Sequence, residues 1–302
     1  MLELRDQIPE VWDESPEELV AIEAIRPLVI RYRQSELTNR RVGRELRNGL
    51  GGGTGSGKTT AIRVILEHRE AVGLADRDIV EQVRARPARG EEVQALLEGR
   101  AEQFGRFINL TDKEKFDEMA AHLENGTFIQ AEDVGGRPYA SGFQTEESMP
   151  HRPVAFAEYT TGTWKRNIED GSFTGVEAIA YLVTSSISRL KQDLLARGGG
   201  KLPTNMARRI DLDVADGETA LKAAEDGSLP IRVVQNPRGR TDGSGLQYDP
   251  NSREIPLAAA GISAVWRGDY SERHNQLGIE AGHRYLDFLR EARQEFDFID
   301  EV

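Results

Sequence analysis

The sequence contains no cysteine, which excludes disulfide bonds, thiolate metal sites and cysteine nucleophiles together. It also lacks any apolar run that approaches the roughly 18 residues of a membrane-spanning helix. The first residues, Met1 to Asp6, mix acidic and apolar side chains and do not follow the pattern of a signal peptide. We therefore expect a cytoplasmic protein that does not enter a membrane.

Negative charge exceeds positive charge. The chain carries 39 Lys and Arg residues against 51 Asp and Glu residues, a formal net charge of −12. A sequence-independent nucleic-acid binder needs a basic face that displaces counterions, so this balance argues against nucleic acid as a partner. A nucleotide substrate stays compatible with it, because a small phosphate site needs only a few well-placed cations.

Short apolar runs of strand type alternate with helical patterns along the chain. The runs lie at 27–30, 128–129, 154–156, 179–183 and 231–234. This alternation predicts an α/β fold with a parallel sheet. The last segment, from Ser271, has apolar residues at helical spacing: Tyr285, Leu289, Ala292 and Phe296. A helix of this kind suits packing on the core or on a second subunit, which would make a homodimer.

One glycine-rich stretch matches G-x-x-x-x-G-K-[ST]. It consists of Gly52, Gly53, Thr54, Gly55, Ser56, Gly57, Lys58 and Thr59, with Thr60 directly after it. Glycines permit the dihedral angles that curl backbone N–H groups around a phosphate. We expect Lys58 to contact the β- and γ-phosphates of ATP, and the Thr59 hydroxyl to bind Mg²⁺. A helix that begins at Lys58 would add its dipole.

The segment before this loop does not have the composition of the strand that should precede it. A central parallel strand is expected to be almost wholly apolar. Residues 38–50 are polar and rich in arginine instead. The apolar residues 28–30 are the alternative strand, although a long excursion would then separate strand and loop. A flexible glycine-rich turn is the alternative interpretation of the loop itself.

The motifs after the loop resemble, in order, those of the guanylate kinase family. Residues 85–92 are similar to the family segment T-R-x-x-R-x-G-E, with arginines at Arg86 and Arg89. Residues 136–141 are similar to the family segment G-N-x-Y-G-[ST], with its tyrosine at Tyr139. The resemblance implies that these three side chains hold the phosphate of an acceptor nucleotide.

The same resemblance implies which residues read the acceptor base. The family glutamate that ends F-[IL]-E is replaced by Gln130, and Ser141 occupies the Ser/Thr place. A carboxylate accepts two hydrogen bonds from the guanine edge, whereas an amide offers one acceptor and one donor group. Gln130 therefore leaves open a base other than guanine, or a modified acceptor.

Further segments resemble the strand end, the lid and the adenine side of the family. Glu158 is the remaining carboxylate near the strand end, where it would contact the acceptor or a Mg²⁺-bound water; the alternative is a surface glutamate. Residues 194–198 are similar to the lid entry L-x-x-R-G. The resemblance implies that lid arginines at Arg197 and at Arg208 or Arg209 cover the transferring phosphoryl group, and that Asn236 contacts adenine.

The resemblance implies a three-layer α/β P-loop NTPase core with a parallel sheet, a small acceptor-binding insert and a short lid. We expect the core at 46–236, the insert at about 84–143 and the lid at about 197–209, between an N-terminal helical extension (1–45) and a C-terminal loop and helical extension (237–302). The implied activity is Mg²⁺-dependent phosphoryl transfer from ATP to GMP or dGMP. The alternatives are a P-loop kinase for a non-guanine or modified nucleotide, and a non-catalytic guanylate-kinase-like binding module.

Overall fold

The computed structural model describes residues 48–53, 55–75, 79–81, 83–86, 98–99, 107–109, 128–134, 137–142, 154–156, 159–169, 171, 175–184, 204–237 and 255–295. In the strands between 79 and 156, and at 204–209 and 295, the description covers the backbone alone. The chain divides into two compact units. One unit contains 1–44 and 80–151, and the other contains 45–79 and 152–302. The predicted N-terminal extension lies outside the described residues.

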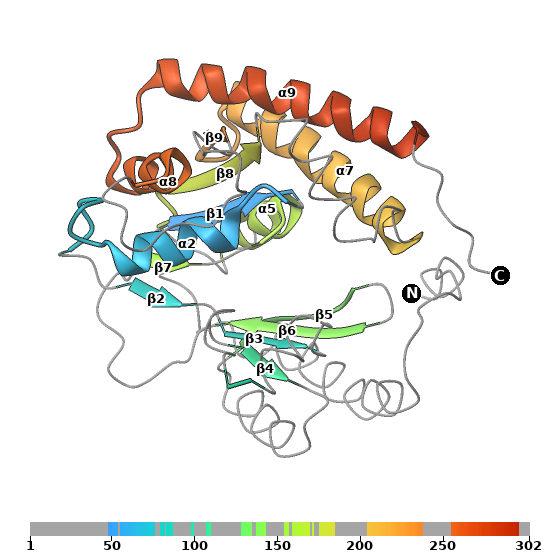
Figure 1. Cartoon of the computed structure of the whole chain (residues 1–302), viewed down its shortest axis with the longest axis horizontal. Helices are drawn as coiled ribbons and strands as arrows, with labels where there is room; N and C mark the ends of the chain where they lie inside the picture. The colour runs from blue at the N-terminus through green and yellow to red at the C-terminus, as the bar shows by residue number, and fades with distance from the viewer. Residues whose placement is uncertain are drawn as a thin grey trace. The chain divides into compact units, whose positions relative to one another are not determined.

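The larger unit is built on a parallel sheet with the strand order β1-β8-β9 (Figure 1). Its strands are β1 (Asn48–Gly52), β8 (Ala178–Thr184) and β9 (Ile231–Asn236), and the short strand β7 (Val154–Phe156) also belongs to this unit. Its helices are α2 (Lys58–Glu67), α5 (Thr161–Glu169), α7 (Thr204–Asp226), α8 (Leu257–Arg267) and α9 (Glu272–Glu295).

Helices cover both faces of this sheet. On one face, Leu50 of β1, Leu182 of β8 and Val234 of β9 share a buried core with α2 and α8. On the other face, α9 lies against β8 and β9, and α7 packs between α9 and α5. Three layers with parallel strands confirm the predicted α/β P-loop core. Within the described residues, no helix is long and apolar enough to cross a membrane.

The strand before the glycine-rich loop is β1 itself, so the prediction that this segment is unsuited to a strand is wrong. Residues 48–52 pair in parallel with 178–182, although their sequence is Asn-Gly-Leu-Gly-Gly. The first four of these residues are buried. The strand runs directly into the loop, and no excursion separates the two. The alternative strand at 28–30 lies outside the described residues.

Aromatic side chains from other elements replace the missing side chains of β1. A methyl group on Gly49 would lie 2.2 Å from a ring carbon of Trp164, which is fully buried on α5. One on Gly51 would lie 2.8 Å from the ring of Tyr181 on β8. The indole Nε1 of Trp266 on α8 donates a hydrogen bond to the Gly49 carbonyl at 3.0 Å. The strand is apolar in its surroundings rather than in its own residues.

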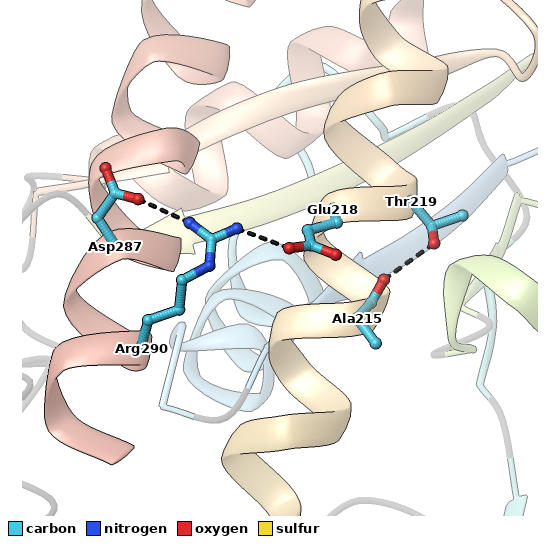
Figure 2. A network of polar contacts seen from close by, with 5 residues as sticks. All are labelled: Ala215, Glu218, Thr219, Asp287 and Arg290. Atoms are coloured by element: carbon cyan, nitrogen blue, oxygen red, sulfur yellow. Dashed lines mark hydrogen bonds and ion pairs between the residues drawn. The ribbon is translucent and has the colours of Figure 1, made fainter. Parts of the chain in front are cut away.

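Helices α7 and α9 run antiparallel in close contact because each presents a glycine to the other. A methyl group on Gly217 of α7 would lie 2.5 Å from Leu286 of α9. One on Gly282 of α9 would lie 2.5 Å from Leu221 of α7. Exposed polar pairs flank this contact: Asp211 with Arg293, Glu218 with Arg290, and Glu225 with His283. Figure 2 shows Arg290 between Glu218 and Asp287.

The predicted C-terminal helix is confirmed as α9, which begins at Glu272. Tyr285, Leu289 and Ala292 of its predicted apolar stripe are buried within the single chain, whereas Phe296 lies outside the described residues. The stripe thus packs on the core of the same chain. A homodimer through this helix stays a prediction.

The smaller unit contains a four-stranded sheet with the order β4-β3-β6-β5. Its strands are β3 (Val83–Arg86), β4 (Phe107–Asn109), β5 (Phe128–Val134) and β6 (Arg137–Gly142). Strands β3 and β4 are parallel, and β6 is antiparallel to both β3 and β5. The strand β2 (Ile79–Glu81) lies where the chain passes from one unit to the other.

Candidate nucleotide-binding site

The glycine-rich loop connects the carboxyl end of β1 to the start of α2. Gly52, Gly55 and Gly57 have φ angles of 137°, 71° and 94°, which side chains disfavour. Gly57 is the N-cap of α2, and no side chain caps this helix end. An uncapped helix start of this kind favours an anion; phosphate binding by the loop stays a prediction.

The ammonium group of Lys58 lies over the same loop. Its Nζ donates to the carbonyl oxygens of Gly52 at 2.6 Å and Gly53 at 3.0 Å. The Gly53 carbonyl also accepts the Ser56 N–H at 3.2 Å. These hydrogen bonds hold the loop in a compact turn, with the Lys58 ammonium as the positive charge beside it. Thr59, which follows in the first turn of α2, is exposed.

Ser56 and Asn236 are joined at the far side of the loop. The Ser56 side chain is fully buried, and its hydroxyl has no hydrogen-bond partner among the described residues. The Asn236 Nδ2, at the end of β9, donates to the Ser56 carbonyl at 2.7 Å. A methyl group on Gly57 would lie 2.4 Å from that nitrogen. The structure therefore brings Asn236 to the phosphate loop; a contact with adenine stays a prediction.

A half-buried carboxyl group, Asp216, links three elements of the larger unit, and the sequence patterns did not single it out. Asp216 of α7 accepts the Thr161 backbone N–H at the start of α5 at 2.5 Å and the Tyr181 hydroxyl at 3.1 Å. Burial raises the pKa of Asp216, because the charged form loses its hydration. Burial also raises the pKa of Tyr181 well above its usual value. The network ties helix α7 to α5 and β8.

The smaller unit aligns three of the predicted acceptor residues. Gln130 of β5 lies opposite Ser141 of β6, and Tyr139 of β6 lies opposite Glu132 of β5. Residues opposite each other share a face of the sheet, and so do residues two apart on one strand. Gln130, Tyr139 and Ser141 therefore occupy register positions on one face. Glu132, which the sequence analysis did not single out, is on that face too.

Strand β3 adds arginines to this face. Arg84 lies opposite Ser141, and Arg86 is two residues further along the same strand. Both therefore share the face with the predicted base-reading positions. Arg86 was predicted to bind the acceptor phosphate, but Arg84 was missed. The alternation of Arg84, Ala85 and Arg86 was the signal that could have indicated it.

The remaining predicted residues are described in part or not at all. Thr54, Arg89, Glu158 and Arg197 lie outside the described residues. Arg208 and Arg209 lie near the start of α7, where only the backbone is described. Their proposed roles at the acceptor, the metal and the lid stay predictions.

The parallel sheet, the loop after β1 and the uncapped start of α2 define an α/β fold of the P-loop type. Neither the models of known protein families nor the curated proteins contain a match to this sequence. Among solved structures, the chain is similar to guanylate kinase from Anaplasma phagocytophilum, with a TM-score of 0.36 and 15% identity over 78% of this chain and 90% of that one. It is also similar to a chain from the PezAT chromosomal toxin–antitoxin system of Streptococcus pneumoniae, with a TM-score of 0.25 and 13% identity over 93% and 100%. At these scores neither likeness bears on function.

Proposed function

We propose that this protein is a phosphotransferase that moves the γ-phosphoryl group of ATP to a nucleoside monophosphate. The observation that carries the proposal is the convergence of Lys58, the positive-φ glycines and the uncapped helix α2 at the end of β1. Backbone N–H groups, a helix dipole and one ammonium group there favour a polyphosphate. A phosphate oxygen of the acceptor would attack the γ-phosphorus while its bond to the bridging oxygen breaks, so ADP leaves.

Mg²⁺ is the proposed metal of the same site. Thr59 lies in the first turn of α2, directly after Lys58, and its side chain is exposed rather than buried in the core. Its hydroxyl would hold the ion, and Glu158 is a proposed second-sphere partner through water. When bound, the ion would neutralise charge on the β- and γ-phosphates. Lys58 would orient the donor, and Arg197 with Arg208 or Arg209 would cover the transferring group.

The acceptor would bind at the face formed by β3, β5 and β6. Arg86, with Arg89 and Tyr139, would hold its phosphate, since guanidinium groups form strong paired bonds to phosphate oxygens. Gln130 and Ser141 lie opposite each other and would contact the base. GMP or dGMP is the proposed acceptor, because Glu132 adds a carboxylate at a neighbouring position on this face.

A second candidate is a kinase of the same fold that acts on a non-guanine or modified nucleotide. Gln130 favours it, because an amide N–H₂ that faces the guanine N1–H or N2–H₂ leaves a mismatch worth roughly 1–3 kcal/mol. A third candidate is a guanylate-kinase-like module that binds ligands without catalysis.

One experiment separates these candidates. ADP release from Mg²⁺-ATP would be measured with GMP, dGMP, AMP, UMP and CMP offered separately, with Lys58→Ala as the control. Turnover with GMP or dGMP alone supports the first proposal, and turnover with another acceptor supports the second. ATP binding without acceptor-dependent turnover supports the binding module. Turnover that Lys58→Ala retains in full would contradict both kinase proposals.

A further inference from the structure

A tyrosine from the C-terminal helix lies beside the phosphate loop. Tyr285 of α9 is fully buried. A methyl group on Gly53 would lie 2.3 Å from the Tyr285 hydroxyl oxygen, and 3.2 Å and 3.3 Å from the nearest ring carbons. The hydroxyl thus occupies the space that a side chain at this loop position would need. Gly53 and Tyr285 come from segments far apart in the sequence, within the same unit.

Gly53 is the point through which this contact reaches the phosphate-binding groups. Its carbonyl oxygen accepts both the Lys58 ammonium at 3.0 Å and the Ser56 N–H at 3.2 Å. A displacement of the Gly53 peptide would therefore move the Lys58 ammonium and the Ser56 backbone together. The position of the Tyr285 hydroxyl limits that displacement on one side.

Helix α9 holds Tyr285 in a fixed place because its first half is anchored to β9. The Asn275 Oδ1 accepts the backbone N–H of Val233 at 2.9 Å in a buried hydrogen bond. Gly278, one turn later, lies so close to β9 that a methyl group there would be 2.0 Å from the Val233 carbonyl oxygen. The helix is thereby fixed to the strand, two turns before Tyr285.

We propose that Tyr285 is a positioning residue of the nucleotide site, which sets the place of Gly53 and, through its carbonyl, that of Lys58. The inference rests on the proposed function of the loop as the ATP site. It gives the C-terminal helix, which lies outside the segment that resembles guanylate kinase, a task in phosphate binding. Tyr285 should therefore affect the binding of the nucleoside triphosphate and not that of the acceptor.

The test removes the Tyr285 hydroxyl and, separately, adds at Gly53 the methyl group that would collide with it. In the full-length protein, Tyr285→Phe keeps the ring and removes the hydroxyl, so the dissociation constant for Mg²⁺-ATP should rise about three- to tenfold. Gly53→Ala should weaken ATP binding more strongly, because its methyl group meets that hydroxyl. The double variant Gly53→Ala/Tyr285→Phe should bind ATP more tightly than Gly53→Ala alone, since the remaining ring carbons leave more room.

Tyr270→Phe is the matched control. It removes a half-buried hydroxyl that donates to the Val233 carbonyl at 3.0 Å and has no described contact with the loop. It should lower Tm without changing ATP affinity. In turnover, Tyr285→Phe should raise the KM for ATP and leave the KM for the acceptor unchanged.

The outcomes distinguish this inference from the proposed function. If the unaltered protein binds ATP, Lys58→Ala does not, and Tyr285→Phe binds like the unaltered protein, the inference is overturned while the function stands. An absence of rescue in the double variant, or an equal loss of affinity in Tyr270→Phe, would also overturn it. If the unaltered protein does not bind Mg²⁺-ATP, the proposed function and the inference both fall.

Discussion

At the residue scale, the glycines of β1 are positions where large side chains from other elements approach the backbone. Trp164 fills the space beside Gly49, and Tyr181 fills the space beside Gly51. Each glycine is required by its neighbour rather than by its own dihedral angles, since neither has a positive φ. The stability of β1 therefore depends on the absence of a side chain at Gly49 and Gly51.

A substitution at Gly49 tests this view. Gly49→Ala places a methyl group 2.2 Å from Trp164, so we expect a loss of roughly 1–3 kcal/mol in the free energy of unfolding, as is usual for overpacking. Urea titration would measure it. Gly162→Ala on α5 is the control, because nothing lies within 4 Å of the added methyl group. It should be neutral or stabilising by up to about 1 kcal/mol. Equal stability of the two variants would contradict the packing account.

Asp216 gives a pH prediction. Its pKa is raised in the folded state from the ordinary value of 3.8, so folding favours its protonated form. The stability that this proton contributes is fully present below the unfolded pKa and is lost as the pH rises through the folded pKa. The protein should thus gain stability relative to Asp216→Asn as the pH falls from 7 towards 4. Urea titrations of both proteins across this range would measure the difference, and a difference that grew towards neutral pH would contradict the prediction.

Gln130 gives a specificity prediction for the proposed acceptor site. If GMP is the acceptor, Gln130→Glu replaces a mismatched amide by a carboxylate that accepts both guanine donors. The KM for GMP should fall by about 5- to 150-fold, the equivalent of 1–3 kcal/mol. Steady-state kinetics would measure it, with Thr219→Val, on exposed helix surface of the other unit, as a control that leaves it unchanged. A rise in the KM would show that Gln130 reads a different base.

At the element scale, two kinds of contact hold the C-terminal helix in place. The side-chain oxygen of Asn275 accepts the Val233 N–H of β9 in a buried hydrogen bond. Arg290 forms exposed ion pairs with Glu218 and Asp287 (Figure 2). A buried donor left without its partner costs about 1–3 kcal/mol, whereas exposed ion pairs contribute about 0–1 kcal/mol. The buried bond should dominate.

Paired variants test that order. Asn275→Ala should lower the free energy of unfolding by about 1–3 kcal/mol, because it leaves the Val233 N–H unpaired. Arg290→Gln should lower it by less than about 1 kcal/mol, and by still less in high salt. Urea titrations at low and high ionic strength would measure both. A larger loss for Arg290→Gln would show that the surface charges, and not the buried bond, hold α9.

The elements differ in how far the sequence could predict them. The strands β7, β8 and β9 and the helices α2 and α9 were predicted close to their observed bounds, because their own residues carry the apolar pattern. Strand β1 could not be predicted, because its apolar surroundings come from Trp164, Tyr181 and Trp266, far away in the sequence. The contacts of Asp216 and Tyr285 were missed for the same reason, since each joins segments far apart in the sequence.

At the scale of the whole molecule, one unit carries the phosphate loop and the other carries the face with the predicted acceptor positions. The register of β3, β5 and β6 places Arg86, Gln130, Tyr139 and Ser141 together on that face. The family resemblance singled out these residues but not their shared face, because the pairing between strands is set by the sheet. The C-terminal helices complete the core around the loop rather than standing apart from it.

The central claim is that the loop after β1 binds the phosphates of ATP through Lys58. Isothermal titration of Mg²⁺-ATP into the unaltered protein and into Lys58→Ala tests it most directly. We expect saturable binding by the unaltered protein and a loss of at least about tenfold in affinity for Lys58→Ala, as removal of charge-assisted bonds worth about 1.5–3 kcal/mol implies. Equal affinity of the two proteins, or no binding by the unaltered one, would contradict the account.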